Sequence, residues 1–132
     1  MHLKCQFQLP YRRIYVNKGL FYIEAFVSDL TRSKQFYGDI LGWKLETDLP
    51  EVAGYYFGTG YLVLVKESRP ENEQIYSGGM YVEVEVENAA AEYERLKSLG
   101  ISLSELENKP WGESKFTFKD PDGYTWAYGQ AS

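Results

Sequence analysis

Two pairs of side chains in this sequence have types and positions suited to holding a small molecule. Tyr22 is followed two residues later by Glu24, and Tyr81 is followed two residues later by Glu83. Each pair lies in a strand-like run with apolar residues at the alternate positions, so the tyrosine and the glutamate share one face. Carboxylates attract a cationic group, rings stack on planar or apolar groups, and phenols donate hydrogen bonds. The two pairs therefore predict a negative, aromatic ligand site.

The segments that carry these pairs belong to an internal repeat. After the first pair an amphipathic stretch runs from Asp29 to Gly42, and after the second a similar stretch runs from Glu87 to Gly100. Each glycine stands 13 positions after its acidic residue (42 − 29 and 100 − 87). Corresponding residues of the two halves are 58 positions apart (87 − 29). This pattern predicts two similar half-domains with the ligand in the groove between them.

Each half has the order strand, helix, strand, strand, strand. We predict helices that begin after Asp29 and Asn88, and strands over residues 20–27, 43–49, 52–57, 61–66, 80–86, 101–106, 115–119 and 124–128. Residues 120–123 (DPDG) predict a tight turn. The expected organisation is one domain over 1–132, with an arm (1–18), a first module (19–67), a crossover (68–78) and a second module (79–132). The arm, with Pro10 and the pair Arg12-Arg13, fits an edge strand or a segment packed on a partner.

The amino-acid composition limits the kinds of partner that the protein is expected to bind. The net charge is −5 and the pI is near 4.9, which disfavours nucleic acid and anionic membranes and fits a cationic or neutral small ligand better. Cys5 is the only cysteine, which excludes an internal disulfide and is compatible with a reducing cytoplasm. Nucleophilic chemistry at Cys5 would need a nearby base, and the only histidine, His2, lies at the frayed start of the sequence, so we expect Cys5 to be inert. No run approaches the ~18 apolar residues of a membrane helix.

The paired modules, the run VSDLTRSKQFY that starts at Val27, and the closing DPDG together resemble one group of proteins. This is the vicinal oxygen chelate superfamily, which includes glyoxalases, bleomycin-resistance proteins and extradiol dioxygenases. The resemblance covers about residues 20–129 and is strongest to uncharacterised glyoxalase-like members. It implies an α+β fold in which two βαβββ modules form a curved mixed sheet around a cleft, with one helix per module on the outer face. It also implies a homodimer.

The resemblance further places the metal ligands of the superfamily's enzymes on this sequence. The positions on the first strand of each module fall on Tyr22 and Tyr81, the position on the final strand falls on Ala127, and the fourth falls within residues 61–66. None is a customary ligand, because Mg, Mn, Ni and Zn ions bind carboxylates and imidazoles. We therefore expect no metal, no cofactor and no catalytic residue.

The expected cleft residues come from strand alternation and from loops beside the strands. We predict ligand contacts from Tyr22, Glu24, Phe26, Phe57, Tyr81, Glu83, Trp111 and Lys115. Alternatives stay open for three of the positions. The glutamates could simply face water or pair with Lys115, and Trp111 could be a lid over the cleft or a cover for a sheet edge. Trp126 shares its face with core positions.

The leading functional hypothesis is a metal-independent protein that binds or sequesters a small organic compound. One alternative is an enzyme of the same superfamily that uses Glu24 or Glu83 as a general base, or uses a divalent metal through other ligands. Another is a scaffold protein whose cleft is filled by its own aromatic side chains.

Overall fold

The computed structural model describes residues 17–131. His2, Cys5, Pro10 and the pair Arg12-Arg13 lie outside the described residues, so the expectations for them stay predictions. The first module contains β1 (Ile23–Val27), α2 (Leu30–Lys34), a π-helix η1 (Gln35–Ile40), β2 (Lys44–Asp48), β3 (Val52–Phe57) and β4 (Gly60–Lys66). A short 3₁₀-helix η2 (Glu71–Glu73) lies in the crossover, and the second module contains β5 (Val82–Glu85), α3 (Ala89–Ser98), β6 (Glu107–Asn108), β7 (Ser114–Lys119) and β8 (Thr125–Gln130).

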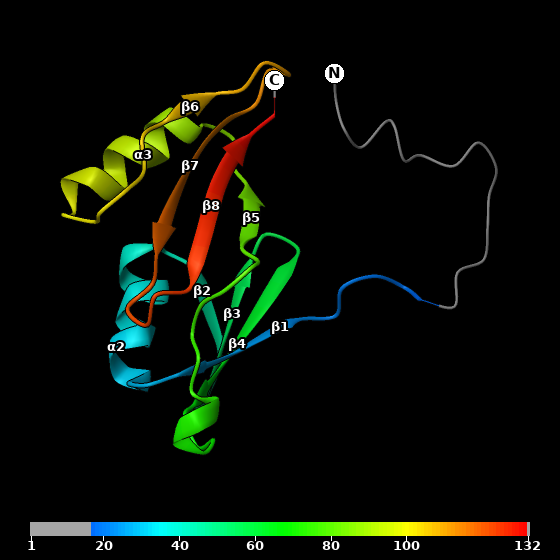
Figure 1. Ribbon diagram of the computed structural model, residues 1–132, viewed down its shortest axis with the longest axis vertical. Coiled ribbons are helices and arrows are strands. Elements are labelled where there is room, and N and C mark those ends of the chain that lie inside the picture. Colours follow the sequence, from blue (N-terminus) through cyan, green and yellow to red (C-terminus); the bar gives the residue numbers. More distant parts are fainter. Residues whose placement is uncertain (1–16, 132) are drawn as a thin grey trace.

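Each module forms its own four-stranded mixed sheet. The strand orders are β1-β4-β3-β2 and β5-β8-β7-β6, so the two modules have the same topology. In each sheet the first strand runs parallel to the last and the remaining pairs are antiparallel. Figure 1 shows the two sheets with α2 and η1 close to the end of β7 and the start of β8, and α3 beside β7. The predicted α+β fold of two βαβββ modules is confirmed.

The two helices begin alike but differ in length. The side chains of Asp29 and Asn88 each accept a hydrogen bond from the backbone amide three residues further along the chain. The two capping residues are therefore 59 positions apart (88 − 29). The sequence predicted a uniform offset of 58 positions, counted from Asp29 to Glu87, and for the helix starts this prediction was wrong. The first helix contains the extra residue as a π-helical turn, in which the Leu41 amide donates to the Phe36 carbonyl.

The predicted strand over residues 101–106 was also wrong. This segment forms one isolated bridge, between Leu103 and Phe118, and regular pairing with β7 begins only at Glu107. The reason is local, because the Ser104 hydroxyl accepts the Thr117 amide at 2.7 Å and so replaces a carbonyl of the ladder. The other predicted strands are present, with ends that differ by a few residues.

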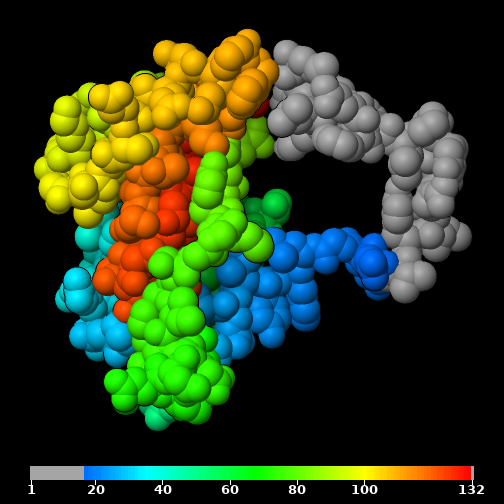
Figure 2. Space-filling model, in the orientation of Figure 1, coloured from blue at the N-terminus to red at the C-terminus, as the bar shows by residue number. Residues whose placement is uncertain are grey.

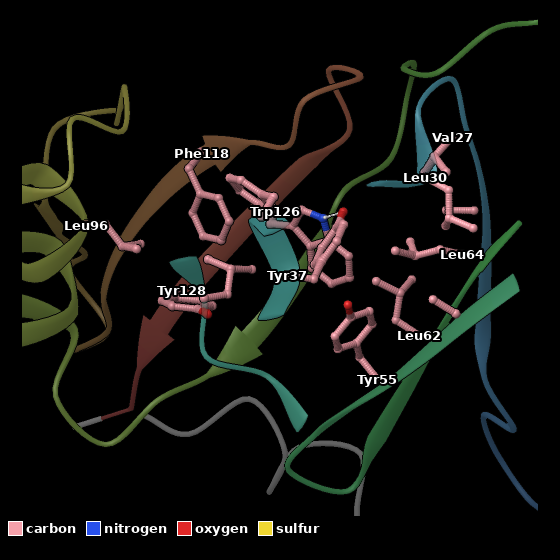
Figure 3. Packing of buried hydrophobic residues seen from close by; sticks show 14 of the residues in the cluster. Val27, Leu30, Tyr37, Tyr55, Leu62, Leu64, Leu96, Phe118, Trp126 and Tyr128 are labelled. Carbon is pink, nitrogen blue, oxygen red and sulfur yellow. Dashed lines mark hydrogen bonds between the residues drawn. The ribbon is translucent and has the colours of Figure 1, made fainter. Parts of the chain in front are cut away.

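A single hydrophobic core joins the two modules. Trp126, from β8, contacts Tyr37 from η1 and Trp43 from the loop after it, with ring centroids 5.9 and 5.1 Å apart. The Trp126 Nε1 group donates to the Tyr37 hydroxyl at 2.9 Å, as Figure 3 shows. Tyr37 in turn donates to the buried carboxylate of Asp120 at 2.7 Å. One hydrogen-bonded chain therefore runs from the first module's helix to the second module's last two strands.

The predicted turn at residues 120–123 is confirmed. The Gly123 amide donates to the Asp120 carbonyl, and the Asp120 carboxylate accepts the amides of Asp122 and Tyr124. Asp122 turns outward and accepts from the Ser28 amide, which ties the turn to the end of β1. Within residues 17–131, no helix is both long and apolar enough to span a bilayer.

Candidate functional site

The strand register makes Glu24 and Glu83 equivalent residues of their modules. Glu24 is paired with Val63 on the parallel strand β4, and Glu83 is paired with Ala127 on the parallel strand β8. The neighbouring apolar residues of β1 and β5 pack against the core, as the alternation predicted. Both glutamates therefore project from the sheet faces that are not covered by the core.

A pocket of about 300 Å³ lies at the junction of the two modules. Its walls are β1, the beginnings of β5 and β8, and crossover residues 75–78, with the core rings of Tyr37 and Trp126 at its base. Figure 2 shows the crossover, in green, lying across this face of the molecule between the second module and the blue residues of the first. Glu24 and Tyr81 both line the pocket, so the fold brings together one predicted residue from each module.

Glu24 differs from Glu83 in its surroundings. Among residues 17–131, no side chain or backbone amide forms a hydrogen bond or ion pair with the Glu24 carboxylate. Glu83 instead accepts a hydrogen bond from the Lys115 ammonium at 2.9 Å, and Lys115 also donates to the Tyr81 hydroxyl at 2.7 Å. The Lys115 ammonium lies 5.1 Å from the centre of the Tyr81 ring. The second module thus supplies its own cation, whereas the carboxylate of the first module is open to the pocket.

A second carboxylate, Glu113, lies against Glu83. Both reach the space above Gly129, where the Cβ of any other residue would collide with Glu83 Oε2 and stand 2.9 Å from Glu113 Oε2. Glycine at position 129 is therefore what makes room for the two carboxylates. The Trp111 Nε1 group donates to the other oxygen of Glu113 at 3.2 Å, so this pair also holds the exposed indole in place.

The pKa values of the two carboxyl groups are shifted in opposite directions. Burial raises the pKa of Glu83, and the hydrogen bond to Glu113 raises it further, while the same hydrogen bond lowers the pKa of Glu113. Burial alone would lower the pKa of Lys115, but its hydrogen bonds to Tyr81 and Glu83 outweigh burial and raise it. Glu83, Glu113 and Lys115 thus form a cluster of two carboxyl groups and one ammonium group next to the pocket.

These opposite pKa shifts predict a pH dependence of stability. Because the pKa of Glu83 is raised in the folded state, the folded protein binds more protons than the unfolded chain above the ordinary value of 4.5. The stability that Glu83 contributes therefore falls as the pH rises from the ordinary pKa of a glutamate toward the raised pKa of Glu83. The lowered pKa of Glu113 has the opposite effect at lower pH, where the stability that Glu113 contributes increases with pH. Glu113→Gln, whose amide can donate to Glu83, should flatten both changes. Urea unfolding at several pH values measures this, with Glu94→Gln, a change on the exposed face of α3, as the control. An unaltered pH profile in Glu113→Gln would show that the hydrogen bond between the two carboxyl groups does not cause these pKa shifts.

The remaining predicted residues lie apart from this group. The Phe26 ring is covered by the Arg69 guanidinium, 4.1 Å from its centre, and Arg69 is paired with Glu67. Phe57 stacks on Trp43 with centroids 4.6 Å apart and packs against the core. Tyr22, the residue before β1, is 43% exposed. The structure thus brings Tyr81, Glu83 and Lys115 together. Trp111 is connected to this group through Glu113, and Glu24 lies in the same pocket as Tyr81. The other predicted contacts lie outside the group: Tyr22, Phe26 and Phe57.

Sequence reasoning missed three parts of the site. Glu113 precedes β7 on the same alternating face as Lys115, and that spacing was a usable signal. Gly129 interrupts a strand, and a glycine in a strand often marks a close approach. The crossover wall at residues 75–78 had no signal in the sequence, because polar loop residues do not reveal which surface they cover.

A more open groove of about 460 Å³ lies between η1 and strands β2 and β3. Its lysine, Lys34, already pairs with Asp48 at 2.6 Å, and the Tyr55 hydroxyl donates to the Lys34 carbonyl. None of the predicted ligand contacts lines this groove. We therefore take the junction pocket as the candidate site.

Comparison with known proteins agrees with the topology. The profile of the Glyoxalase/Bleomycin resistance protein/Dioxygenase superfamily matches residues 19–128. The chain belongs to this superfamily. None of the curated proteins compared with it matches.

Several solved structures of superfamily type resemble this member in fold. TnmS3, an antibiotic binding protein from Streptomyces sp. CB03234, is 24% identical with a TM-score of 0.75, over 90% of this chain and 100% of that one. The fosfomycin resistance protein FosX from Listeria monocytogenes is 15% identical with a TM-score of 0.75, over 89% and 96%. Lactoylglutathione lyase from Agrobacterium tumefaciens is 18% identical with a TM-score of 0.70, over 88% and 96%. At these identities the likeness shows the fold alone.

The superfamily's metal positions do not fit a metal in this chain. Tyr22 and Tyr81 offer only neutral phenols, Ala127 has no donor atom, and Val63 stands opposite Glu24 on β4. Across the part of the chain that the structure describes, no three or more His, Cys, Asp or Glu side chains are grouped to hold an ion. Glu83, the acidic residue beside these positions in the second module, is instead paired with Lys115.

Proposed function

We propose that this superfamily member binds or sequesters a small organic compound in the junction pocket without a metal or cofactor. The ligand carries a cationic or hydrogen-bond-donating group that meets Glu24, and an apolar or aromatic body that lies among the rings. The observation that carries the proposal is the Glu24 carboxylate, which has no partner within residues 17–131 and lines a pocket.

The chemistry of the pocket supports this ligand class. Tyr76, Tyr81 and Tyr124 contribute rings to the wall, and Ile23 and Leu62 contribute aliphatic surface. Lys115 already neutralises Glu83, so Glu24 is the carboxylate left to attract a cation. That TnmS3 is described as an antibiotic binding protein is consistent with a binding role on this fold.

The test is calorimetric titration with amine-bearing aromatic compounds selected by thermal shift. Glu24→Gln keeps the size of the side chain and removes its charge, so affinity for a hit should fall roughly 10- to 100-fold, the worth of one charged hydrogen bond. Glu94→Gln removes an equally exposed charge from α3 and should leave affinity unchanged. Equal affinity of wild type and Glu24→Gln would remove Glu24 from the site. The protein should be purified without a histidine tag and analysed for metal first.

A second candidate function is proton-transfer catalysis at Glu83. The observation that favours it is the raised pKa of Glu83 beside the Lys115 ammonium and the Tyr81 hydroxyl, two groups that can stabilise an oxyanion. Exchange of solvent deuterium into a bound carbonyl compound, lost in Glu83→Gln, is the expected sign of this activity. Binding without any exchange would leave the first proposal alone.

We also propose a homodimer in the cytoplasm. Exposed apolar side chains on the edge strand β2 and its neighbour, Leu45 and Tyr56, support association. Sedimentation at several protein concentrations tests it, and a monomer at micromolar concentration would contradict it.

A further inference from the structure

β1 has one edge that is free of other strands in the part of the chain from residue 17 to residue 131. The strand pairs only with β4, in parallel register. A free strand edge presents backbone amides and carbonyls that can pair with another extended chain. The groups on this edge are therefore able to bind a ligand that has a backbone of its own.

The hydrogen bonds of β1 identify the residues that face the free edge. The Val27 carbonyl accepts the Glu67 amide, so the backbone groups of Val27 point to the β4 side. Because alternate residues of a strand bond to opposite sides, Ala25 also bonds to β4. The amides and carbonyls of Glu24 and Phe26 therefore point to the free edge.

This free edge faces the junction pocket. The Phe26 carbonyl accepts the Tyr124 hydroxyl at 2.9 Å, and Tyr124 lines the pocket. Glu24 lines the pocket too, and its backbone amide and carbonyl have no hydrogen-bond partner among residues 17–131. One residue thus offers the pocket a backbone donor, a backbone acceptor and a carboxylate.

The residues next to Glu24 add an apolar surface. Ile23 and Ala25 point their side chains to the opposite face of β1 from Glu24, toward the core, and both line the pocket. An extended ligand beside this edge has the same alternation of side chains. One ligand residue would therefore lie beside the Glu24 carboxylate, and the next would lie beside the apolar surface.

We propose that the junction pocket binds a peptide or a peptide-like amide as a short antiparallel strand on the free edge at Glu24. In this arrangement a basic residue of the ligand lies directly opposite Glu24. Its N–H donates to the Glu24 carbonyl, its carbonyl accepts the Glu24 amide, and its cationic side chain meets the Glu24 carboxylate. The next ligand residue is apolar or aromatic and lies against Ile23 and Ala25. This inference rests on the proposed function, whose ligand class it narrows.

The free edge is short, which limits the length of the ligand. The Phe26 carbonyl is already bonded to the Tyr124 hydroxyl, so strand pairing cannot continue past Glu24 in that direction. Recognition by strand addition combines main-chain hydrogen bonds, which give affinity, with pockets for alternate side chains, which give specificity. A ligand of two or three residues uses both.

Titration calorimetry of the full-length protein with acetyl-Lys-Phe-amide tests the pairing. A methyl group on the lysine backbone nitrogen removes the N–H that faces the Glu24 carbonyl, so affinity should fall about tenfold or more. A methyl group on the phenylalanine nitrogen adds the same bulk to an N–H that points away from β1, and should change affinity less than about twofold. Equal losses for the two methylated peptides, or no binding of the parent peptide, would overturn strand addition.

Amide hydrogen exchange, followed by NMR, is a second readout of the same pairing. With saturating peptide, the Glu24 amide should exchange about tenfold or more slowly than in the free protein. The Ala25 amide bonds to β4 in both states, so its exchange rate should not change. A Glu24 amide that exchanges equally fast with and without bound peptide would contradict the inference.

Glu24→Gln separates this inference from the proposed function. The substitution removes the charge but keeps the strand edge, so it should weaken binding of all three peptides and preserve the difference between the two methylated ones. If Glu24→Gln weakens binding while the methylated peptides bind equally well, the pocket binds a cation without strand addition, and only the inference fails. If the methylated peptides differ but Glu24→Gln has no effect, strand addition stands and the proposed role of the carboxylate fails.

Discussion

Trp126→Ala should destabilise the protein by about 3–5 kcal/mol, the cost typical of removing a large buried aromatic side chain. Trp126 is 3% exposed and packs edge-on against rings from the first module, including Tyr37, Trp43 and Phe57. Its removal leaves a cavity at the surface where the two modules meet. It also leaves the Tyr37 hydroxyl without its indole donor. Denaturant unfolding, followed by far-UV circular dichroism, measures the loss.

Trp111→Ala is the matched control for that substitution. The same side chain is deleted, but Trp111 is 44% exposed and its one hydrogen bond goes to Glu113. We expect a change below about 1 kcal/mol, as for surface positions generally. Similar losses for the two tryptophans would mean that the modules do not share the core described above.

Asp120→Ala should be the next most destabilising change, at roughly 2–4 kcal/mol, because it leaves buried donors without acceptors. The Asp120 carboxylate accepts hydrogen bonds from the Tyr37 hydroxyl and from the amides of Asp122 and Tyr124. Burial raises the pKa of Asp120, while these hydrogen bonds oppose the increase. Thermal and urea unfolding report the effect.

Two further variants make the Asp120 result specific. Asp120→Asn retains an acceptor oxygen and should recover part of the loss, whereas Asp39→Ala, an exposed position on η1, should change stability little. If Asp120→Asn proved as harmful as Asp120→Ala, the negative charge would matter more than the hydrogen bonds. A neutral Asp120→Ala would show that the turn does not need its carboxylate.

The fold was largely predictable because its signals are local. Alternation in residues such as Val82 and Val84 gave the strand faces, and capping side chains such as Asp29 gave the helix starts. The errors came from hydrogen bonds that the pattern of residue types does not reveal. Ser104 disrupts a strand by bonding to Thr117, and the π-helical turn in η1 places one more residue between cap and glycine than α3 needs.

The site was predictable only in part. Alternation identified Glu24, Glu83 and Lys115 as residues on the faces away from the core, and pairing of glutamate with lysine was one of the expected outcomes. A balance between Lys115 and Glu83 was among these expectations, and the order of β5, β8 and β7 in one sheet brings the two residues together. The position of Phe26 was not predictable, because its ring is covered by an arginine from the crossover.

The two modules have therefore kept one topology while their equivalent glutamates differ. Glu83 is paired with Lys115 and lies against Glu113, whereas Glu24 faces a pocket made by both modules. This difference localises the proposed binding to the junction. It also separates the pocket, which we propose as the ligand site, from the neighbouring cluster of Glu83, Glu113 and Lys115.

A crystal structure of the untagged protein with its tightest amine-bearing aromatic ligand tests the central claim most directly. We expect the ligand in the junction pocket, with its cationic group within hydrogen-bonding distance of Glu24 and its ring against Tyr81, and with no metal ion bound. A ligand seated in the groove beside η1, or a divalent ion coordinated in the junction pocket, would contradict the account.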